Sequence, residues 1–174
     1  MENSRFDGII NRIKNGDKDA LREVYDEYSA MIYSIVSDIV QNRQDVEDIC
    51  VDFFVKLWQN AGSYRTGGAH RKWLMTIARN MALDFLRKKH VEYPVEDVPV
   101  VSDGSSLEKN AEDRSLVDTV LSSLDADERE ILTLKIMSGF TFKEIAEIMK
   151  KPLSTVTWKY GRIIEKVRGT YGDE

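Results

Sequence analysis

The chain has 174 residues, of which 42% are hydrophobic, and a formal net charge of −5. This length accommodates one ordinary domain or two small ones. Cys50 is the only cysteine and there are two histidines, which excludes an internal disulfide and a His/Cys metal cluster. The N-terminus is polar, and no apolar run is long enough to span a membrane. We expect a soluble cytoplasmic protein with no cofactor, no metal and no direct membrane insertion.

The negative net charge hides a segregation of charge along the chain. Residues 71–89 and residues 150–168 each hold six basic residues and one acid, whereas residues 91–130 hold twelve acids and three basic residues. A nucleic acid responds to the local field rather than to the average over the chain. Two basic segments on either side of an acidic one are therefore compatible with DNA contacts at two places.

Three amphipathic helices are predicted before residue 61. The first covers residues 6–14 and ends at Gly16, the second runs from Asp17 to Ile39, and the third covers residues 45–60. The third helix has an acidic exterior and more large apolar residues than one core needs, so some could face a partner. Its inward-facing residues are predicted to be Val46, Ile49, Cys50, Phe53, Phe54 and Leu57.

A loop and a basic helix follow. Residues 62–69 contain Gly67 and Gly68, which allow positive φ angles, and residues 72–90 have helical periodicity. The predicted buried stripe is Trp73, Leu74, Ile77, Ala78, Met81, Ala82, Phe85 and Leu86. The polar residues predicted to lie off this stripe are Arg79, Asn80, Asp84, Arg87 and Lys88. Such a surface suits contact with exposed bases, but a solvated helix with ordinary ion pairs, such as Asp84 with Lys88, explains the pattern equally well.

The polar, acidic residues 91–110 are typical of a linker without stable structure. The predicted fold class is therefore all-α, with two small helical domains, residues 1–90 and 111–174, joined by this flexible acidic linker. The second domain is predicted to open with a helix ending at Leu124. Asp125 then caps a helix that buries Ile131, Leu132 and residues 134–136 and closes at Gly139.

Residues 141–168 are predicted to form a helix-turn-helix. Thr141 and Glu144 make a capping box, Pro152 stops the first helix, and Ser154 caps the second. The buried stripe of the second helix is predicted to be Val156, Tyr160, Ile163 and Val167. A DNA-binding helix of this kind presents side chains to base edges and phosphates, although a helical hairpin with a solvated basic face would have the same pattern. The candidate DNA-contacting residues are Lys150, Ser154, Thr155, Thr157, Trp158, Lys159, Arg162 and Lys166.

Three segments, in this order, resemble the extracytoplasmic-function group of the bacterial sigma-70 family. DVEDICVDFFVKLW (residues 45–58) is similar to the polymerase-binding segment of the family, and WLMTIARNMALDFLR (residues 73–87) is similar to its promoter-opening helix. Residues 124–156 resemble its C-terminal domain, in which an EIA helix precedes a proline-containing turn. The resemblance covers nearly the whole chain. It implies a non-enzymatic sigma factor that binds core RNA polymerase and directs promoter-specific initiation.

The resemblance also implies a partner for each part. The polymerase-binding helix would dock on the β′ clamp and β subunits through Asp45, Asp48, Asp52, Phe53, Phe54, Leu57 and Trp58. The loop and the basic helix would read and open the promoter −10 element through Tyr64, Arg65, Arg71, Lys72, Arg79, Asn80, Asp84, Arg87 and Lys88. The helix-turn-helix would read the −35 element through the eight candidates named above. An anti-sigma factor is a further expected partner.

Some positions depart from the family pattern. Val51 stands where Gln is frequent, and His70 stands where an aromatic residue such as Phe is frequent. Lys150 replaces the usual turn glycine, so we expect a tighter or strained turn. Thr157 and Trp158 stand where Lys or Arg followed by Ser is common, so we expect an altered −35 preference. Trp158 would pack on a thymine methyl or a sugar, or else fold back into the core.

Two other functions fit parts of the pattern. A standalone helix-turn-helix regulator with a helical sensor or dimerisation domain would bind specific duplex DNA without polymerase. A helical enzyme is disfavoured because the two histidines and the single cysteine offer no nucleophile–base pair.

Overall fold

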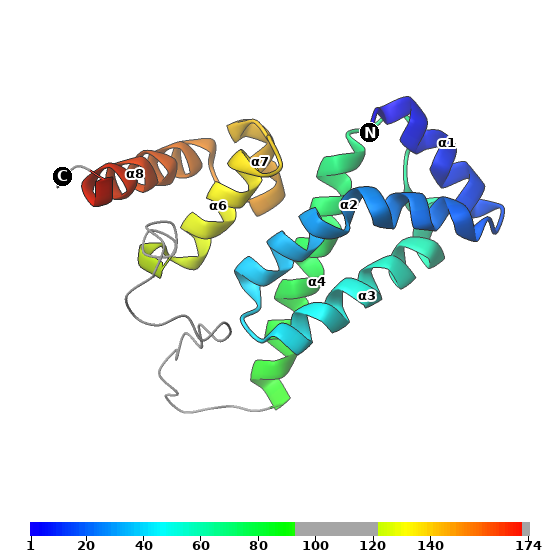
Figure 1. Ribbon diagram of the computed structural model, residues 1–174, viewed down its shortest axis with the longest axis horizontal. Helices are drawn as coiled ribbons and strands as arrows, with labels where there is room; N and C mark the ends of the chain where they lie inside the picture. The colour runs from blue at the N-terminus through cyan, green and yellow to red at the C-terminus, as the bar shows by residue number, and fades with distance from the viewer. Residues whose placement is uncertain (93–121, 172–174) are drawn as a thin grey trace. The chain divides into compact units, whose positions relative to one another are not determined.

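The computed structural model describes residues 1–92 and 122–171, which belong to two compact units, Met1–Glu96 and Asp97–Glu174 (Figure 1). Every regular element in the described ranges is helical, which confirms the all-α fold class. Most of the predicted linker, and the helix predicted ahead of Leu124 up to residue 121, lie outside the described residues. Residues 91 and 92, predicted to be linker, are instead helical. No described helix is both long and apolar enough to cross a membrane.

Residues 1–92 of the N-terminal unit form four α-helices: α1 (Asn3–Lys14), α2 (Lys18–Ile39), α3 (Arg43–Asn60) and α4 (His70–Glu92), with a short 3₁₀ helix, η1 (Ala61–Ser63), after α3. Gly16, at φ 84°, turns the chain after α1. The Asp17 carboxylate accepts hydrogen bonds from the Asp19 and Ala20 amides and so fixes the start of α2. Asn42 caps α3 by accepting from the Asp45 amide at 3.0 Å, so this helix begins two residues earlier than predicted.

The core of the N-terminal unit lies where α2, α3 and α4 pack together, with α1 against α2. Its centre is formed by the fully buried residues Phe6, Ile10, Ile32, Ile35, Phe53, Leu74 and Met75. The buried stripe of α4 differs from the predicted one, because Met75 is buried whereas Trp73, Ile77 and Met81 are only half-buried and Leu86 is exposed. The stripe is centred on Ala78 and Ala82, whose small side chains let α4 approach its neighbours closely.

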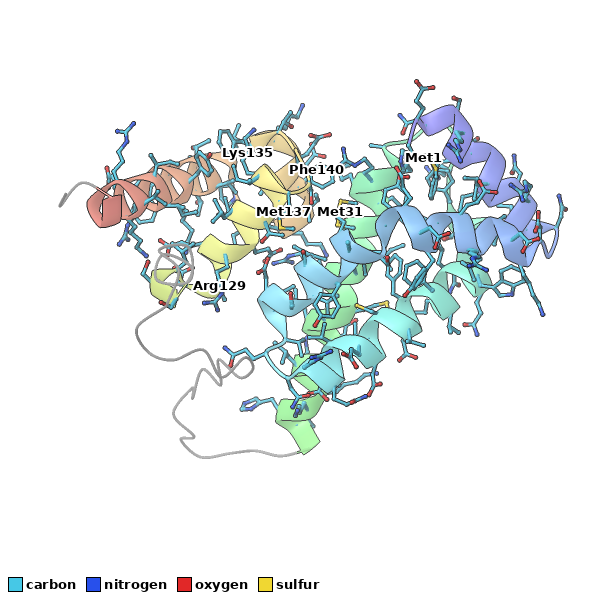
Figure 2. All side chains as sticks on the ribbon, viewed as in Figure 1. Met1, Met31, Arg129, Lys135, Met137 and Phe140 are labelled. Carbon is cyan, nitrogen blue, oxygen red and sulfur yellow. The ribbon has the colours of Figure 1, made fainter. Side chains whose placement is uncertain are left out.

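The C-terminal unit contains α6 (Ala126–Ile136), α7 (Phe142–Met149) and α8 (Leu153–Tyr171). The predicted Asp125 cap and the predicted capping box of Thr141 with Glu144 are confirmed, and Asp125 forms a full capping box with Glu128. Gly139 adopts φ 67° after α6, as predicted for the closing residue. In this turn Lys135 donates to the Phe140 carbonyl at 3.2 Å, and both side chains are labelled in Figure 2.

Two details of the C-terminal unit differ from prediction. Ile136 is exposed, because the buried face of α6 follows Ile131 and Leu134 and turns away before residue 136. The Pro152 carbonyl accepts the Val156 amide at 3.2 Å, so α8 already begins at Leu153 and Ser154 lies inside its first turn rather than capping it. The core forms where α8 packs on α6 and α7, around Ile131, Leu134, Ile145, Ile148, Val156 and Ile163.

Candidate functional site

A groove of about 380 Å³ runs between α2 and α3 in the N-terminal unit. The rings of Tyr25 and Phe54 meet across it with centroids 4.9 Å apart. Cys50 lines the groove, and burial, followed by the charge of Glu47, raises the pKa of its thiol to about 11. The thiol form of Cys50 is therefore favoured over the thiolate at neutral pH. The lining residues are Tyr25, Ser29, Ala30, Tyr33, Glu47, Cys50, Val51 and Phe54.

The predicted polymerase-binding residues divide between the surface and the core. Asp48 and Asp52 are exposed on α3 and Trp58 is half-buried. Asp45 forms an ion pair with Lys89 of α4 at 2.7 Å. Phe53, Phe54 and Leu57 are buried, so in this conformation they support α3 from beneath.

The outward face of α3 also carries two exposed apolar residues, Val51, named above as a departure from the family pattern, and Val55, which the sequence did not single out. Val51 is 64% exposed and Val55 is 47% exposed. They are four residues apart and therefore share one side of the helix. Exposed valines repeated at helical spacing are the signal that identifies them as candidate contacts.

A second concavity, which we call the loop pocket, has a volume of about 430 Å³ and lies where the loop after η1 meets the start of α4. The rings of Tyr64 and Trp73 stand 4.9 Å apart in a tilted arrangement inside it. Arg65 is exposed and Lys72 half-buried, so both can place positive charge near the pocket mouth. The lining residues are Ser63, Tyr64, Arg65, Gly68, Ala69, Lys72, Trp73 and Thr76.

The loop pocket brings together Tyr64, Arg65 and Lys72, which the sequence had proposed as −10 contacts. It adds Trp73, assigned to the core by its spacing, and Thr76. Helical spacing could have identified Thr76, because it lies between Lys72 and Asn80 at steps of four. Further along α4, Asp84 and Arg87 form an ion pair at 3.1 Å, and Lys88 is exposed.

Two arginines among the predicted −10 contacts do not line the loop pocket. Arg79 is only 7% exposed, so the prediction that it lies off the buried stripe is wrong. It sits one turn after the buried Met75, on the side of α4 that faces the core. Arg71 points toward α2, where its guanidinium lies 3.9 Å from the Met31 sulfur.

A buried histidine anchors the start of α4. His70 stacks on Phe6 with ring centroids 4.5 Å apart, and its Nε2 accepts a hydrogen bond from the Tyr28 hydroxyl at 2.6 Å. The opposite ring nitrogen, Nδ1, hydrogen-bonds to the Asn3 amide oxygen. Burial, together with the charges of the N-terminus and Arg71, lowers the pKa of His70, so the neutral ring is favoured. His70 therefore fills the place of an aromatic core residue while satisfying both of its ring nitrogens.

The outer face of α8 is built around Trp158. This side chain is 59% exposed, so the alternative that it folds back into the core is wrong. The Arg162 guanidinium lies over the indole ring, 5.1 Å from its centroid. Ser154 and Thr157 are exposed nearby, and the Thr157 hydroxyl bonds back to the Leu153 carbonyl at 3.0 Å. An aromatic ring, a guanidinium and hydroxyl groups thus share one face, as a helix that contacts DNA requires.

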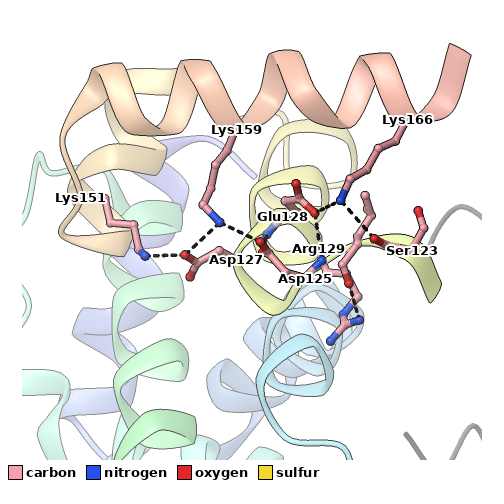
Figure 3. Close-up of polar contacts among 9 residues, drawn as sticks. Ser123, Asp125, Asp127, Glu128, Arg129, Lys151, Lys159 and Lys166 are labelled. Atoms are coloured by element: carbon pink, nitrogen blue, oxygen red, sulfur yellow. Dashed lines mark hydrogen bonds and ion pairs between the residues drawn. The ribbon is translucent and has the colours of Figure 1, made fainter. Parts of the chain in front are cut away.

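Two lysines predicted to lie on that outer face instead turn toward α6 (Figure 3). Lys159 forms ion pairs with Asp125 at 2.9 Å and with Asp127 at 3.4 Å. Lys166 bonds to the buried Glu128 and to the Ser123 carbonyl. Each lysine follows a buried stripe residue, Val156 or Ile163, by three positions, which places it at the edge of the buried face. We call Lys151, Lys159, Lys166 and their partners Asp125, Asp127 and Glu128 the lysine–acid network.

The network shifts the pKa values of its members. Burial alone would raise the pKa of Asp125 and of Glu128, but hydrogen bonds from Lys159 and Lys166 bring both values below the ordinary range. Burial would likewise lower the pKa of Lys159, but its bond to Asp125 and the two nearby carboxylate charges raise it. All three groups are therefore held in their charged forms.

The turn before α8 contains Lys150 at φ 54° and ψ 43°. This left-handed conformation is uncommon for a residue with a side chain, and the prediction of a strained turn is confirmed. The Lys150 side chain is exposed. Across residues 1–92 and 122–171, no group of three or more His, Cys, Asp or Glu side chains could hold a metal ion.

Two family models match this chain. Residues 24–91 match sigma-70 region 2 and residues 114–166 match sigma-70 region 4, together well over half of the chain. The ECF RNA polymerase sigma factor SigW of Bacillus subtilis is 27% identical over 173 residues, covering 91% of this chain and 92% of that protein. The ECF RNA polymerase sigma-E factor of Escherichia coli is 28% identical, covering 91% of this chain and 90% of the relative.

Solved structures show the same fold. The sigma factor RpoE in complex with the anti-sigma factor NepR from Bartonella quintana aligns with a TM-score of 0.66 at 21% identity, covering 88% of this chain and 97% of that one. CnrH in complex with the cytosolic domain of CnrY aligns with a TM-score of 0.64 at 18% identity, covering 95% of this chain and 97% of that one.

Proposed function

We propose that this chain, which belongs to the extracytoplasmic-function group of the sigma-70 family, performs its three tasks on three separate surfaces. It binds core RNA polymerase and directs promoter-specific transcription initiation by recognising the −10 and −35 elements. The chemistry of RNA synthesis belongs to the polymerase, and this protein supplies binding and specificity in the cytoplasm.

The surface for core polymerase is the outward face of α3. Val51 and Val55 give it an exposed apolar centre, and Asp48 and Asp52 give it negative charge. An interface of this kind gains affinity from the apolar residues and orientation from the charges. The buried Phe53 and Leu57 fix the helix from beneath.

A charge placed in the centre of this face tests the assignment. Val51→Asp should weaken binding to core polymerase by about 1–3 kcal/mol, the cost of burying an unpaired polar group. Ile136→Asp is the matched control, because Ile136 is 64% exposed, the same fraction as Val51, and lies on α6 in the C-terminal unit. Equal affinity of the two variants in a fluorescence-anisotropy titration with core enzyme would move the docking site elsewhere.

The surface for the −10 element is the loop pocket, and its paired aromatic rings are the observation that carries this proposal. Tyr64 and Trp73 lie 4.9 Å apart in a concavity of about 430 Å³, within the size range of small-ligand sites. An unpaired base can enter and stack on an aromatic side chain there, while Arg65 and Lys72 meet the strand's phosphates. Capture of the base offsets the few kcal/mol per step that unstacking costs.

Strand capture can be followed with 2-aminopurine placed at each non-template position of the −10 element in turn. The fluorescence of this base rises when it leaves the stack. Trp73→Ala should weaken capture by about 1–3 kcal/mol, the usual value of one base–aromatic stack. Lys72→Ala should weaken it less and in a salt-dependent way, whereas Lys14→Ala, an exposed lysine of α1, is the charge-matched control. Full fluorescence with Trp73→Ala would place base capture outside this pocket.

The surface for the −35 element is the outer face of α8. Trp158 and Arg162 point outward together, whereas Lys159 and Lys166 are occupied by α6. We assign Trp158 to apolar contact with a thymine methyl or a sugar and Arg162 to a base edge or phosphate. Lys159 and Lys166 orient α8 rather than bind DNA. This separates the recognition residues from those that hold the recognition helix in place.

An anti-sigma factor is the proposed regulator. Support comes from the two structural neighbours, a sigma factor bound to NepR and CnrH bound to the cytosolic domain of CnrY. Binding of such a protein to the α3 face would compete with polymerase. A protein that binds this chain and is displaced by core polymerase in a competition experiment would be identified as this regulator.

A further inference from the structure

The first helix, α1, lies outside the two family matches, which begin at residue 24 and at residue 114. It nevertheless reaches the loop that lines the pocket for the −10 strand. Phe6 is fully buried, and its ring lies 5.2 Å from that of Tyr64 and 4.5 Å from that of His70. A single α1 side chain therefore touches both ends of the loop between residues 64 and 70.

The middle of the loop is held by the next residue of α1. The Gly67 amide donates to Oδ2 of Asp7 at 2.9 Å, a contact that spans sixty residues of sequence. Gly67 adopts φ 77°, a left-handed conformation, and a Cβ on Gly68 would lie 3.2 Å from the Arg65 carbonyl oxygen. The turn is therefore tight, and the Asp7 carboxylate ties it to α1.

The Asp7 carboxylate also lies near the aromatic part of the pocket. The pKa of Tyr64 rises to about 12, first because the ring is buried and next because the Asp7 carboxylate is beside its hydroxyl. The hydroxyl itself donates to the Gly68 carbonyl at 3.4 Å. A carboxylate thus lies next to both the turn and the ring that shape the pocket.

We propose that Asp7 is a positioning residue for promoter opening, which holds the Gly67 turn so that the loop pocket exists before the −10 strand arrives. The inference rests on the proposed function of that pocket. A loop that is already ordered loses less conformational freedom when it binds, so removing the tether weakens capture without removing any group that touches the strand. Because one hydrogen bond to a charged acceptor is involved, we expect Asp7→Ala to reduce promoter opening about tenfold.

The experiment uses polymerase holoenzyme assembled with the full chain. Affinity for core polymerase and 2-aminopurine fluorescence in the −10 strand are measured for the wild type, Asp7→Ala, Asp7→Asn and the control Asp26→Asn. Asp26 is an exposed acid of α2 and its substitution makes the same change in charge. Asp7→Ala should lower opening while keeping the affinity for core polymerase. Asp7→Asn keeps an acceptor for the Gly67 amide and should recover most of the loss.

Two results would overturn the proposal. Opening by Asp7→Ala at the wild-type level would show that the tether does not matter. A parallel loss of core-polymerase affinity would show that Asp7 merely supports the fold, since α3 belongs to the same unit. Trp73→Ala, measured in parallel, separates this inference from its premise. If Trp73→Ala opens promoters at the wild-type level, the assignment of the loop pocket to the −10 strand is wrong. If Trp73→Ala is impaired and Asp7→Ala opens promoters at the wild-type level, only the positioning role of Asp7 is wrong.

Discussion

Replacing Lys166 by methionine should destabilise the C-terminal unit while leaving its candidate DNA-binding face intact. The Glu128 side chain is 3% exposed and accepts two hydrogen bonds, one from Lys166 and one from the Asp125 amide at 2.9 Å. Methionine preserves much of the apolar stem of the lysine but removes its charge. A buried carboxylate would then keep a single backbone partner.

The size of the effect follows from the burial of the pair. Removing one partner of a fully buried ion pair costs roughly 3–5 kcal/mol. The Lys166 side chain is 30% exposed, so water can approach the vacated position and the expected cost falls to about 1–3 kcal/mol. In a small domain this lowers Tm by about 4–8 °C for each kcal/mol. Adding Glu128→Gln should recover part of the loss, because the buried group is then neutral.

Hydrogen exchange of the full chain measures the effect where it arises. Amides of α6 should exchange faster in Lys166→Met, whereas those of α2 and α3 should be unchanged and serve as an internal reference. Lys143→Met, at an exposed position of α7, is the matched control. Wild-type protection in Lys166→Met, or no recovery with Glu128→Gln, would refute the role assigned to the network. The network's stabilisation of the C-terminal unit should also depend on pH, because the pKa values of Asp125 and Glu128 are lowered in the folded protein. The stabilisation is complete above the ordinary pKa range of these carboxyl groups and is lost as pH falls through their lowered pKa values.

Three further predictions concern single residues. Because the pKa of His70 is lowered from 6.5, the unfolded chain takes up the proton first, so the N-terminal unit should lose stability as pH falls below 6.5. Urea unfolding at pH 7.5 and pH 5.5 should show this loss of stability in the wild type and a smaller loss in His70→Phe. Equal losses in the two proteins would contradict this role of His70. Lys150→Gly should raise Tm, because it relieves about 1–2 kcal/mol of strain in the left-handed conformation, and the larger entropy that glycine loses on folding offsets only part of this gain. An unchanged or lower Tm would argue against strain at this turn. Trp158→Ala should weaken binding of holoenzyme to the −35 element by about 1–3 kcal/mol. Replacing thymine by uracil, which removes the methyl group, should not weaken the binding of Trp158→Ala further, and Met137→Ala, at another exposed position of this unit, is the control. If uracil weakens the binding of Trp158→Ala as much as that of the wild type, Trp158 does not contact the methyl group.

The sequence is sufficient for features that depend on local chemistry. Helix starts and ends are specified by residues that are close together in the sequence. The structure confirms the caps formed by Asp125 with Glu128 and by Thr141 with Glu144, and the glycine turns at residues 16 and 139. Long periodic stretches such as α2 also follow from spacing alone. These features are readable because the interacting groups are neighbours along the chain.

The rest depends on packing between elements. The buried stripe of α4 takes in Met75 and Arg79 in place of Trp73 and Leu86, a choice between neighbouring faces that apolar spacing alone cannot make. Lys159 and Lys166 lie beside a buried stripe, and only the acids of α6 determine which way their long side chains turn. The loop pocket joins residues from η1, a loop and α4 with a tether from α1. No pattern of adjacent residues specifies that convergence.

Run-off transcription shows whether this protein directs promoter-specific initiation. Bacterial core RNA polymerase, this protein and a library of promoter fragments are incubated with nucleotides, and the transcripts are sequenced. We expect discrete transcripts that require the protein, share upstream −10 and −35 sequences, and diminish with Trp73→Ala. If the protein neither binds core polymerase nor starts transcripts, yet binds a specific duplex by itself, it is a standalone helix-turn-helix regulator and not a sigma factor.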